Sequence, residues 1–297
     1  MSKQINGFSK LSKQEKIDWI SKTHFSDSQK AAHQLSSYWN SSPEVQTRHD
    51  EFIENTLTNF YMPLGVAPNF LINDALYTLP MVIEESSVVA AAGNAAKFWF
   101  SKGGFEAKII DTIKVGQVHF LYEGAPSILN SFFKNNKSKL LEATKPLTLN
   151  MEKRGGGIVS LDLIDKTAAL DHYYQLQVRF KTADAMGANF INSCLESLAD
   201  ELEKVSQQDA SFTEDNPKIE VIMSILSNYV PECLVHAKVS CPIDSIEPQE
   251  GMDGATFAKK IVQAIQIANC EPYRAVTHNK GIMNGVDALV LATGNDF

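Results

Sequence analysis

The first sixty residues carry apolar positions at helical spacing, with polar signals where helices should begin. Ser12 and Glu15 are three residues apart, as in a capping box, and Ser42 followed by Pro43 is typical of a helix start. A further apolar set repeats at intervals that suit one face of a helix: Phe52, Ile53, Leu57 and Phe60. We therefore predict a helical N-terminal region that extends through Phe60.

The pattern then changes to runs that are typical of strands. A turn at Asn73-Asp74 divides the apolar residues within 70–83 into two runs, which predicts a β-hairpin with Pro80 at an edge or a bulge. Residues 86–100 combine small and apolar side chains, and Gly103-Gly104 follows them. This pattern predicts a helix closed by glycine. Its small residues indicate either tight packing or room for a ligand.

Strands and helices are mixed in the rest of the chain. Strand-like runs occupy Val115–Tyr122, Ile158–Ile164 and Tyr173–Lys181. A strongly amphipathic helix follows, with apolar residues at Ile191, Cys194, Leu195, Leu198, Leu202 and Val205. The last apolar segment, Ile282–Ala292, predicts another helix. Because strands and helices do not alternate strictly, we predict an α+β fold rather than a doubly wound sheet.

Composition and charge bound the class of protein. The chain has 297 residues, of which 44% are hydrophobic and 21% charged, so it can bury a sizeable core in about two domains. Its 27 basic and 35 acidic residues give a net charge of −8. A protein whose main task is to bind nucleic acid needs a basic surface, so we expect no nucleic-acid partner.

The cysteines and the N-terminal residues indicate the cellular compartment of the protein. The four cysteines form no CxxC pair, and the histidines are not at metal-ligand spacing, so we expect neither a disulfide framework nor a metal site. The first residues lack the apolar core of a signal peptide, and no stretch of about 18 apolar residues occurs. We therefore expect a soluble cytoplasmic protein without a membrane partner.

Two glycine-containing segments are candidates for contact with a ligand, although the chain lacks the GxGxxG and GxxxxGK[ST] motifs. Arg154-Gly155-Gly156-Gly157 precedes a predicted strand and is either a tight turn or a backbone surface for a ligand. Asp184-Ala185-Met186-Gly187-Ala188-Asn189 opens the amphipathic helix. A helix start offers free N–H groups to a pyrophosphate. The alternative is that Asp184 is only an N-cap and Gly187 only a packing contact.

Charged residues at two places are candidates for acid–base chemistry. Glu84-Glu85 lies between the hairpin and the small-residue helix, where solvated carboxylates are common, and only one of the two can point into a cleft. Lys280 lies in a polar segment just before the last apolar helix, and Asp296 follows that helix. Spacing alone does not establish contact between them. We interpret His278 as a loop or capping residue.

These pieces together resemble a known family. Pro80-Met-Val-Ile-Glu-Glu-Ser-Ser-Val-Val-Ala-Ala-Ala92, the two glycine segments, Ile225-Leu-Ser-Asn228, and the block from Pro272 through Ala292-Thr-Gly-Asn-Asp296 occur in the order found in bacterial class II hydroxymethylglutaryl-CoA (HMG-CoA) reductases. The resemblance covers essentially the whole chain. It implies the reduction of HMG-CoA to mevalonate and free CoA, by two hydride transfers from a nicotinamide cofactor, in the mevalonate pathway of isoprenoid biosynthesis.

The resemblance also implies roles for individual residues. Glu85, not Glu84, would protonate the mevaldehyde oxygen, and Lys280 would stabilise the oxyanion. Asp296 would lie between them, keep Lys280 protonated and raise the pKa of Glu85. The HMG moiety would be held by Ser87, Arg274, Thr277 and Asn284. The cofactor would be bound by Asp184, Ala185, Met186, Gly187, Ala188, Asn189 and Asn228.

The implied architecture is a large, mostly helical substrate domain interrupted by a small ferredoxin-like dinucleotide-binding domain. We place the large domain at 1–112 and 223–297 and the small domain at 113–222. The family also implies a homo-oligomer with the active site at a subunit interface. The cofactor is NADH or NADPH, because neither an acidic residue nor an arginine follows Gly157 in Ile158-Val159-Ser160.

The chain departs from the family at its end. In the family a catalytic histidine follows in a mobile C-terminal flap, and none of the seven histidines here matches it, so the resemblance is to the N-terminal part of the enzyme. We therefore expect the chain as given to complete the reaction poorly. The alternative function is a non-catalytic CoA- or dinucleotide-binding fragment.

Overall fold

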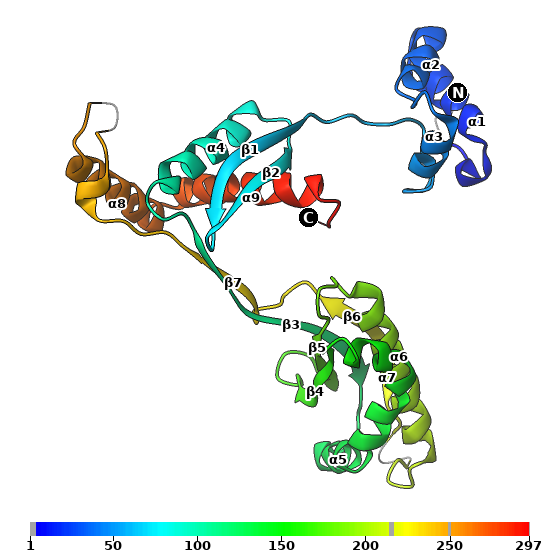
Figure 1. Ribbon diagram of the computed structural model, residues 1–297. Coiled ribbons are helices and arrows are strands. Elements are labelled where there is room, and N and C mark those ends of the chain that lie inside the picture. The colour runs from blue at the N-terminus through cyan, green and yellow to red at the C-terminus, as the bar shows by residue number, and fades with distance from the viewer. Residues whose placement is uncertain (1–3, 214–216, 249–250, 297) are drawn as a thin grey trace. The chain divides into compact units, whose positions relative to one another are not determined.

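The computed structural model describes residues 4–213, 217–248 and 251–296, and it divides into two compact units. One unit contains Met1–Gly104 and Cys241–Phe297, and the other contains Phe105–Ser240 (Figure 1). The predicted α+β class is confirmed, and in the structure Phe105–Ser240 is inserted into the other unit. The divisions fall at 104/105 and 240/241 rather than 112/113 and 222/223, because one long strand of the inserted unit begins at Glu106 and pairs along its first half with residues 233–238.

The first unit begins with short helices: η1 Phe8–Lys10, α1 Lys13–His24, α2 Ser28–Ser37 and α3 Pro43–Asp50. The predicted capping box is present, since the Ser12 side chain accepts from the Glu15 N–H and the Glu15 carboxylate accepts from the Ser12 N–H. The predicted start at Ser42-Pro43 is also confirmed, although the Ser42 side chain makes no capping hydrogen bond.

The helix predicted around Phe52–Phe60 is wrong, because this segment consists of turns and extended backbone. Its polar side chains bond to the preceding helices instead: Thr58 Oγ1 donates to the Leu35 carbonyl oxygen at 2.6 Å and Asn59 Nδ2 to the Tyr38 carbonyl oxygen at 2.9 Å. Of the apolar side chains that suggested a helix face, Leu57 is half-buried, whereas Phe52, Ile53 and Phe60 are 78%, 70% and 87% exposed. The apolar spacing therefore marks no buried face within this chain.

The rest of the first unit is built on a β-hairpin. Strand β1 Leu64–Ile72 pairs antiparallel with β2 Ala75–Val82 around the predicted Asn73-Asp74 turn, and Pro80 lies opposite Val66. The further elements are α4 Ser86–Phe100, η2 Ile243–Ser245, α8 Gly254–Cys270 and α9 Pro272–Ala292. Helix α4 packs on β1 and α9 on β2 (Figure 1), around a small core of Ala67, Met81 and Ala288.

The second unit has the element order of a ferredoxin-like fold. Its elements are β3 Glu106–Leu121, α5 Pro126–Ala143, α6 Lys145–Glu152, β4 Gly157–Asp165, β5 Tyr173–Lys181, α7 Ala188–Gln208, β6 Glu220–Ser227 and β7 Cys233–Lys238. The antiparallel strands lie in the order β4-β5-β3-β6, which is the split β-α-β-β-α-β arrangement. Strand β7 pairs with the first half of β3 and extends the sheet as a two-stranded ribbon (Figure 1).

Alternation along the strands explains the core of this unit. Val118 and Phe120 of β3 and Leu176 and Val178 of β5 are all fully buried and face one side of the sheet. The apolar stripe of α7 that the sequence predicted meets them, because its members are buried in the same cluster: Ile191, Cys194, Leu195, Leu198, Leu202 and Val205. Gly116 permits this close approach, since a Cβ there would lie 2.5 Å from a Leu195 methyl carbon.

Candidate active site

The centre of the candidate site is the carboxylate of Glu85, which meets three side chains in the first unit. Ser87 Oγ donates to Glu85 Oε1 at 3.0 Å. Lys280 Nζ donates to Glu85 Oε2 at 3.2 Å, and Asn284 Nδ2 donates to the same oxygen at 3.1 Å. Both acceptor oxygens of the carboxylate are therefore engaged, and a carboxylate and an ammonium 195 positions apart in the chain form an ion pair.

Local backbone structure explains why the second glutamate of the pair takes this place. Glu85 occupies the N-cap position of α4 with extended backbone, but its side chain does not cap the helix. The carboxylate is therefore free to reach α9. Glu84 lines a neighbouring cavity of about 220 Å³ together with Met62, Val82, Ile83, Asn284, Asp287, Ala288 and Leu291. The structure thus separates two adjacent carboxylates into different surroundings.

Lys280 lies within a helix, which corrects the prediction of a polar segment ahead of one. Helix α9 begins at Pro272, and the Glu271 side chain caps it by accepting from the Arg274 N–H at 2.6 Å. His278 is accordingly a helical residue rather than a loop or capping residue. The error arose because the first half of α9 is polar and largely exposed, so its apolar periodicity is weak.

The helix places the predicted substrate residues on one side. Arg274, Thr277, Lys280 and Asn284 follow one another at intervals of three, three and four residues, which is the spacing of one helix face. Thr277 Oγ1 donates to the Tyr273 carbonyl oxygen at 2.8 Å, and Arg274 is exposed. Only Asn284 of this set joins Lys280 at Glu85. The roles of Arg274, Thr277 and Asn284 in substrate binding and of Lys280 in catalysis stay predictions.

The electrostatics of Glu85 differ from what the family pattern implies. Its pKa lies below the usual value, chiefly because Ser87 donates a hydrogen bond and also because Lys280 donates one and adds its charge. We predicted a raised pKa caused by Asp296, and that is wrong for this structure. Asp296 is exposed, forms no ion pair within 4.0 Å with any residue that the structure describes, and is not among the causes that shift the pKa of Glu85.

The predicted cofactor residues lie together in the second unit. The loop 182–187 leads from β5 into α7, whose N-cap is Gly187 with φ +83°. A Cβ on Gly187 would lie 2.4 Å from Thr182 Cγ2, so the turn requires glycine. Asp184 precedes the helix and is not its N-cap, so the alternative interpretation of that residue is wrong. The first turn of α7 has no side-chain cap and presents its backbone N–H groups.

Asn228 lies at the same end of the sheet as this loop. It follows directly on β6, whose last residue Ser227 pairs with Val115 of β3. Asn192 of α7 accepts a hydrogen bond from the Leu226 N–H at 3.0 Å, which ties β6 to the helix. The structure therefore brings Asn228 to the sheet end where α7 begins, although the two segments are far apart in the sequence.

The Arg154–Gly157 segment forms a tight turn between α6 and β4. Gly155 and Gly157 have positive φ values of 82° and 117°. A Cβ on Gly156 would lie 2.4 Å from the Lys181 carbonyl oxygen. Backbone geometry alone accounts for these glycines, and the segment's place beside β5 puts it next to the loop 182–187.

One residue that contacts the loop 182–187 was not predicted from the sequence. Lys114 of β3 donates through Nζ to Thr182 Oγ1 at 2.5 Å and to the Ala185 carbonyl oxygen at 3.2 Å. A single lysine within an apolar strand run was the available signal, but only the sheet register shows that it faces this loop. Sequence reasoning also missed the contact between Asn284 and Glu85.

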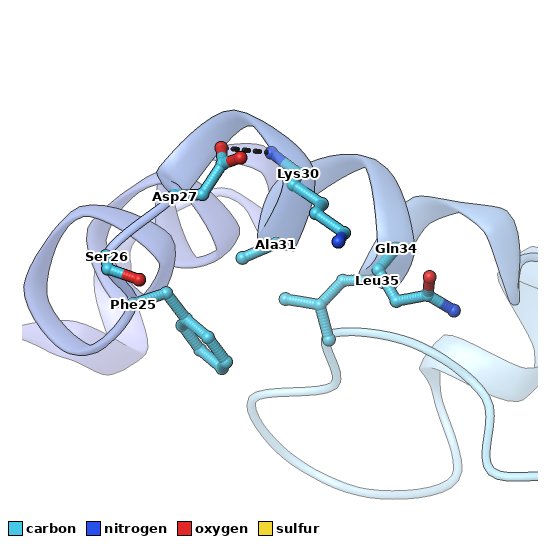
Figure 2. Close-up of a pocket in the computed structure, with 7 residues that line it drawn as sticks. All are labelled: Phe25, Ser26, Asp27, Lys30, Ala31, Gln34 and Leu35. Atoms are coloured by element: carbon cyan, nitrogen blue, oxygen red, sulfur yellow. Dashed lines mark hydrogen bonds between the residues drawn. The ribbon is translucent and has the colours of Figure 1, made fainter.

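A separate hollow of about 420 Å³ lies by the turn between α1 and α2. Phe25, Ala31 and Leu35 form its apolar walls, while Asp27, Lys30 and Gln34 lie around them (Figure 2). The Asp27 side chain accepts from the Lys30 backbone N–H at 2.9 Å and so caps α2. Its polar residues thus serve the helix start, and we assign this hollow no chemistry.

Among the described residues, no group of three or more histidine, cysteine, aspartate or glutamate side chains is placed to hold a metal ion. None of the helices within the described ranges is long and apolar enough to cross a membrane.

Fold and site together define an α+β protein in which a ferredoxin-like unit interrupts a second unit that carries a glutamate–lysine pair. The family model for hydroxymethylglutaryl-coenzyme A reductase matches residues 12–297. The chain therefore belongs to the hydroxymethylglutaryl-coenzyme A reductase family, and the predicted membership is confirmed.

Individual relatives agree with this membership. The chain is 33% identical over 300 residues to 3-hydroxy-3-methylglutaryl-coenzyme A reductase of Archaeoglobus fulgidus, covering 100% of this chain and 63% of that protein. It is 32% identical over 253 residues to the probable 3-hydroxy-3-methylglutaryl-coenzyme A reductase of Borreliella burgdorferi, covering 84% of this chain and 54% of that protein. The chain thus spans less than two thirds of the length of these curated relatives.

Solved structures of the Streptococcus pneumoniae enzyme are similar to this chain. One covers 98% of this chain and 65% of its own, with a TM-score of 0.71 and 33% identity. Another is a class II enzyme bound to NADPH in open conformations. The match covers 98% of this chain and 74% of that chain, with a TM-score of 0.72 and 34% identity. The fold described above is therefore shared by a nicotinamide-bound relative.

Proposed function

We propose that this chain supplies the substrate and cofactor sites of an enzyme that reduces HMG-CoA to mevalonate and free CoA with NADH or NADPH. The observation that carries the proposal is the contact of Glu85 with Lys280 and Asn284 in a chain of this family. Membership of the family indicates that the substrate is HMG-CoA. The contact provides a carboxyl group and an ammonium group that suit the chemistry at the carbonyl carbon of this substrate.

Reduction of a thioester generates negative charge on the carbonyl oxygen. A bound nicotinamide supplies the hydride, and Lys280 stabilises the oxyanion that forms when the hydride reaches carbon. The ammonium is 62% exposed in this structure and 3.2 Å from the Glu85 carboxylate. Its effect therefore grows when bound substrate excludes water from the pair.

The proton for the product oxygen comes from the same pair. The hydrogen bonds from Ser87 and Lys280, together with the charge of Lys280, lower the pKa of Glu85, so Glu85 is ionised at neutral pH. An alkoxide that forms between the two groups accepts a proton from the Lys280 ammonium, and the amine regains a proton from solvent. In this scheme Glu85 acts as a proton donor only after substrate has displaced its hydrogen bonds and the carboxylate has taken up a proton from solvent.

The remaining predicted residues are assigned to binding. Arg274 faces solvent from α9 and suits the free carboxylate of the HMG moiety, which a guanidinium binds through two hydrogen bonds. Ser87, Thr277 and Asn284 supply polar contacts around it. In the second unit the start of α7 suits the anionic pyrophosphate of the cofactor, because its first N–H groups are free of a side-chain cap.

We also propose that the chain works as a homo-oligomer in the cytoplasm. Large apolar side chains are exposed on α8 and α9, among them Val262 at 55%, Val276 at 70% and Ile282 at 52%. Such an area favours coverage by a second copy, and it lies on the helix that carries Lys280. All four cysteines are free, which suits a reducing compartment.

The test is oxidation of NADPH or NADH by the purified chain, followed by its absorbance, with and without HMG-CoA. Release of free CoA is measured with a thiol reagent in the same reaction. Substrate-dependent oxidation with CoA release supports the proposal. The competing function, a CoA- or dinucleotide-binding fragment, predicts that HMG-CoA and NADPH bind in calorimetry while neither oxidation nor CoA release occurs.

A further inference from the structure

Lys114 is held against the loop that precedes α7. Its Nζ donates to Thr182 Oγ1 at 2.5 Å and to the Ala185 carbonyl oxygen at 3.2 Å, while Thr182 Oγ1 itself donates to Ala185 O at 2.6 Å. Thr182 is fully buried, whereas Lys114 is half-buried. The ammonium group is thereby fixed beside a residue that lies two positions before the Gly187 N-cap.

The position is electrostatically unfavourable without a further group. Helix α7 has 21 residues, and the N-terminal end of its dipole is positive, so a cation there is repelled rather than attracted. Across the described residues no carboxylate lies within 4.0 Å of Lys114 Nζ. Two basic residues of the neighbouring strand β5 do have carboxylate partners, since Arg179 pairs with Glu232 and Lys181 with Asp111. Lys114 is therefore a cation that has no carboxylate partner among the described residues.

We propose that Lys114 binds the pyrophosphate of the dinucleotide, together with the backbone N–H groups of the first turn of α7. The inference rests on the proposed function, since it takes the cofactor from there. An ammonium has three donors and two are used within the loop, which leaves one for a phosphate oxygen. The bound anion removes the repulsion between Lys114 and the helix dipole.

A purely structural role for Lys114 makes a different prediction. If the residue served only to hold the loop, its replacement would remove two hydrogen bonds and lower the stability of the free protein. If it binds an anion, replacement also removes a repulsion from the free protein. The melting temperature without ligand then stays level or rises, and only the stabilisation by an anion is lost.

The experiment compares the wild type with Lys114→Met, Lys114→Arg and a matched control, Lys108→Met. Lys108 is an exposed lysine of the same strand, so the control makes the same change of charge. NADPH affinity is measured by calorimetry at low ionic strength, and melting temperatures are measured with and without inorganic pyrophosphate. We expect Lys114→Met to weaken NADPH binding by about tenfold or more. We also expect it to abolish the rise in melting temperature that pyrophosphate causes. Lys114→Arg keeps most of the NADPH affinity and most of the rise in melting temperature with pyrophosphate. Lys108→Met gives the same values as the wild type.

The outcomes separate this inference from the proposed function. Equal NADPH affinity and equal pyrophosphate effects in the wild type and Lys114→Met would overturn the inference and leave the proposed function intact. A pyrophosphate effect that requires Lys114, in a wild type that does not bind NADPH, would support the anion site and overturn the cofactor assignment. A lower melting temperature of ligand-free Lys114→Met with the pyrophosphate effect retained would show a structural role and overturn the inference.

Discussion

Replacement of Lys280 by alanine separates catalysis from stability in this site. The variant removes the ammonium that lies 3.2 Å from Glu85 and leaves the carboxylate with Ser87 and Asn284 as partners. Lys280 and Glu85 are 62% and 45% exposed, and exposed ion pairs contribute little to folding. We therefore expect the melting temperature of Lys280→Ala to stay close to that of the wild type.

Activity should respond very differently. Loss of one group that stabilises an oxyanion typically lowers kcat by about 10²–10³-fold. The pKa of Glu85 should rise at the same time, because Lys280 supplies the second and third largest causes that lower it. The hydrogen bond from Ser87 remains, so part of the lowering should persist.

Three measurements check this prediction. Substrate-dependent NADPH oxidation gives kcat, thermal unfolding gives stability, and carboxyl carbon chemical shifts across a pH titration give the pKa of Glu85. Lys260→Ala on α8 is the matched control, because it removes another exposed lysine of the same unit. Near-normal turnover of Lys280→Ala beside a normal melting temperature would refute the assignment of the oxyanion cation.

Further predictions address the surroundings of the two sites. Asn284→Asp places a second carboxylate about 3 Å from Glu85; we expect a raised pKa of Glu85 in the same titration and weaker activity, and an unchanged pKa would contradict the contact. Gly187→Ala should lower the free energy of unfolding by about 1–3 kcal/mol in chemical denaturation, because φ is +83° and the new Cβ meets Thr182 Cγ2 at 2.4 Å. Thr182→Ser removes that methyl group and should restore part of the loss, whereas no effect of Gly187→Ala would show that the turn adjusts freely. Burial raises the pKa of the Cys194 thiol to about 11; we expect this thiol to react with a maleimide only after unfolding, and rapid labelling of the folded protein would contradict its place in the core.

The sequence predicted those elements whose periodicity reports a buried face. The stripe of α7 is buried where its spacing of three and four residues indicated, and α4 occupies the predicted residues 86–100. The helix around Phe52–Phe60 failed because apolar spacing there does not correspond to burial within the chain. The start of α9 failed for the opposite reason, since a polar, exposed helix shows no apolar stripe.

The candidate site was predicted only in part for a related reason. Glu85, Lys280 and Asn284 come from distant segments, so their contact follows from the packing of α9 on the hairpin and not from spacing. The family pattern named the residues but implied a raised pKa of Glu85, whereas its hydrogen bonds here lower it. Lys114 could not be found from sequence, because its function depends on which strand end lies beside the start of α7.

The most direct test of the central claim is reduction of mevaldehyde, the aldehyde intermediate of the proposed reaction. This step releases no thiolate, so it needs only the hydride donor, Lys280 and Glu85. NADPH oxidation is measured with mevaldehyde for the wild type, Glu85→Gln, Lys280→Ala and the control Lys260→Ala. We predict that mevaldehyde-dependent oxidation occurs in the wild type and the control and falls by about 10²-fold or more in the two site variants. Equal rates in all four proteins, or no mevaldehyde-dependent oxidation by a wild type that binds NADPH, would contradict it.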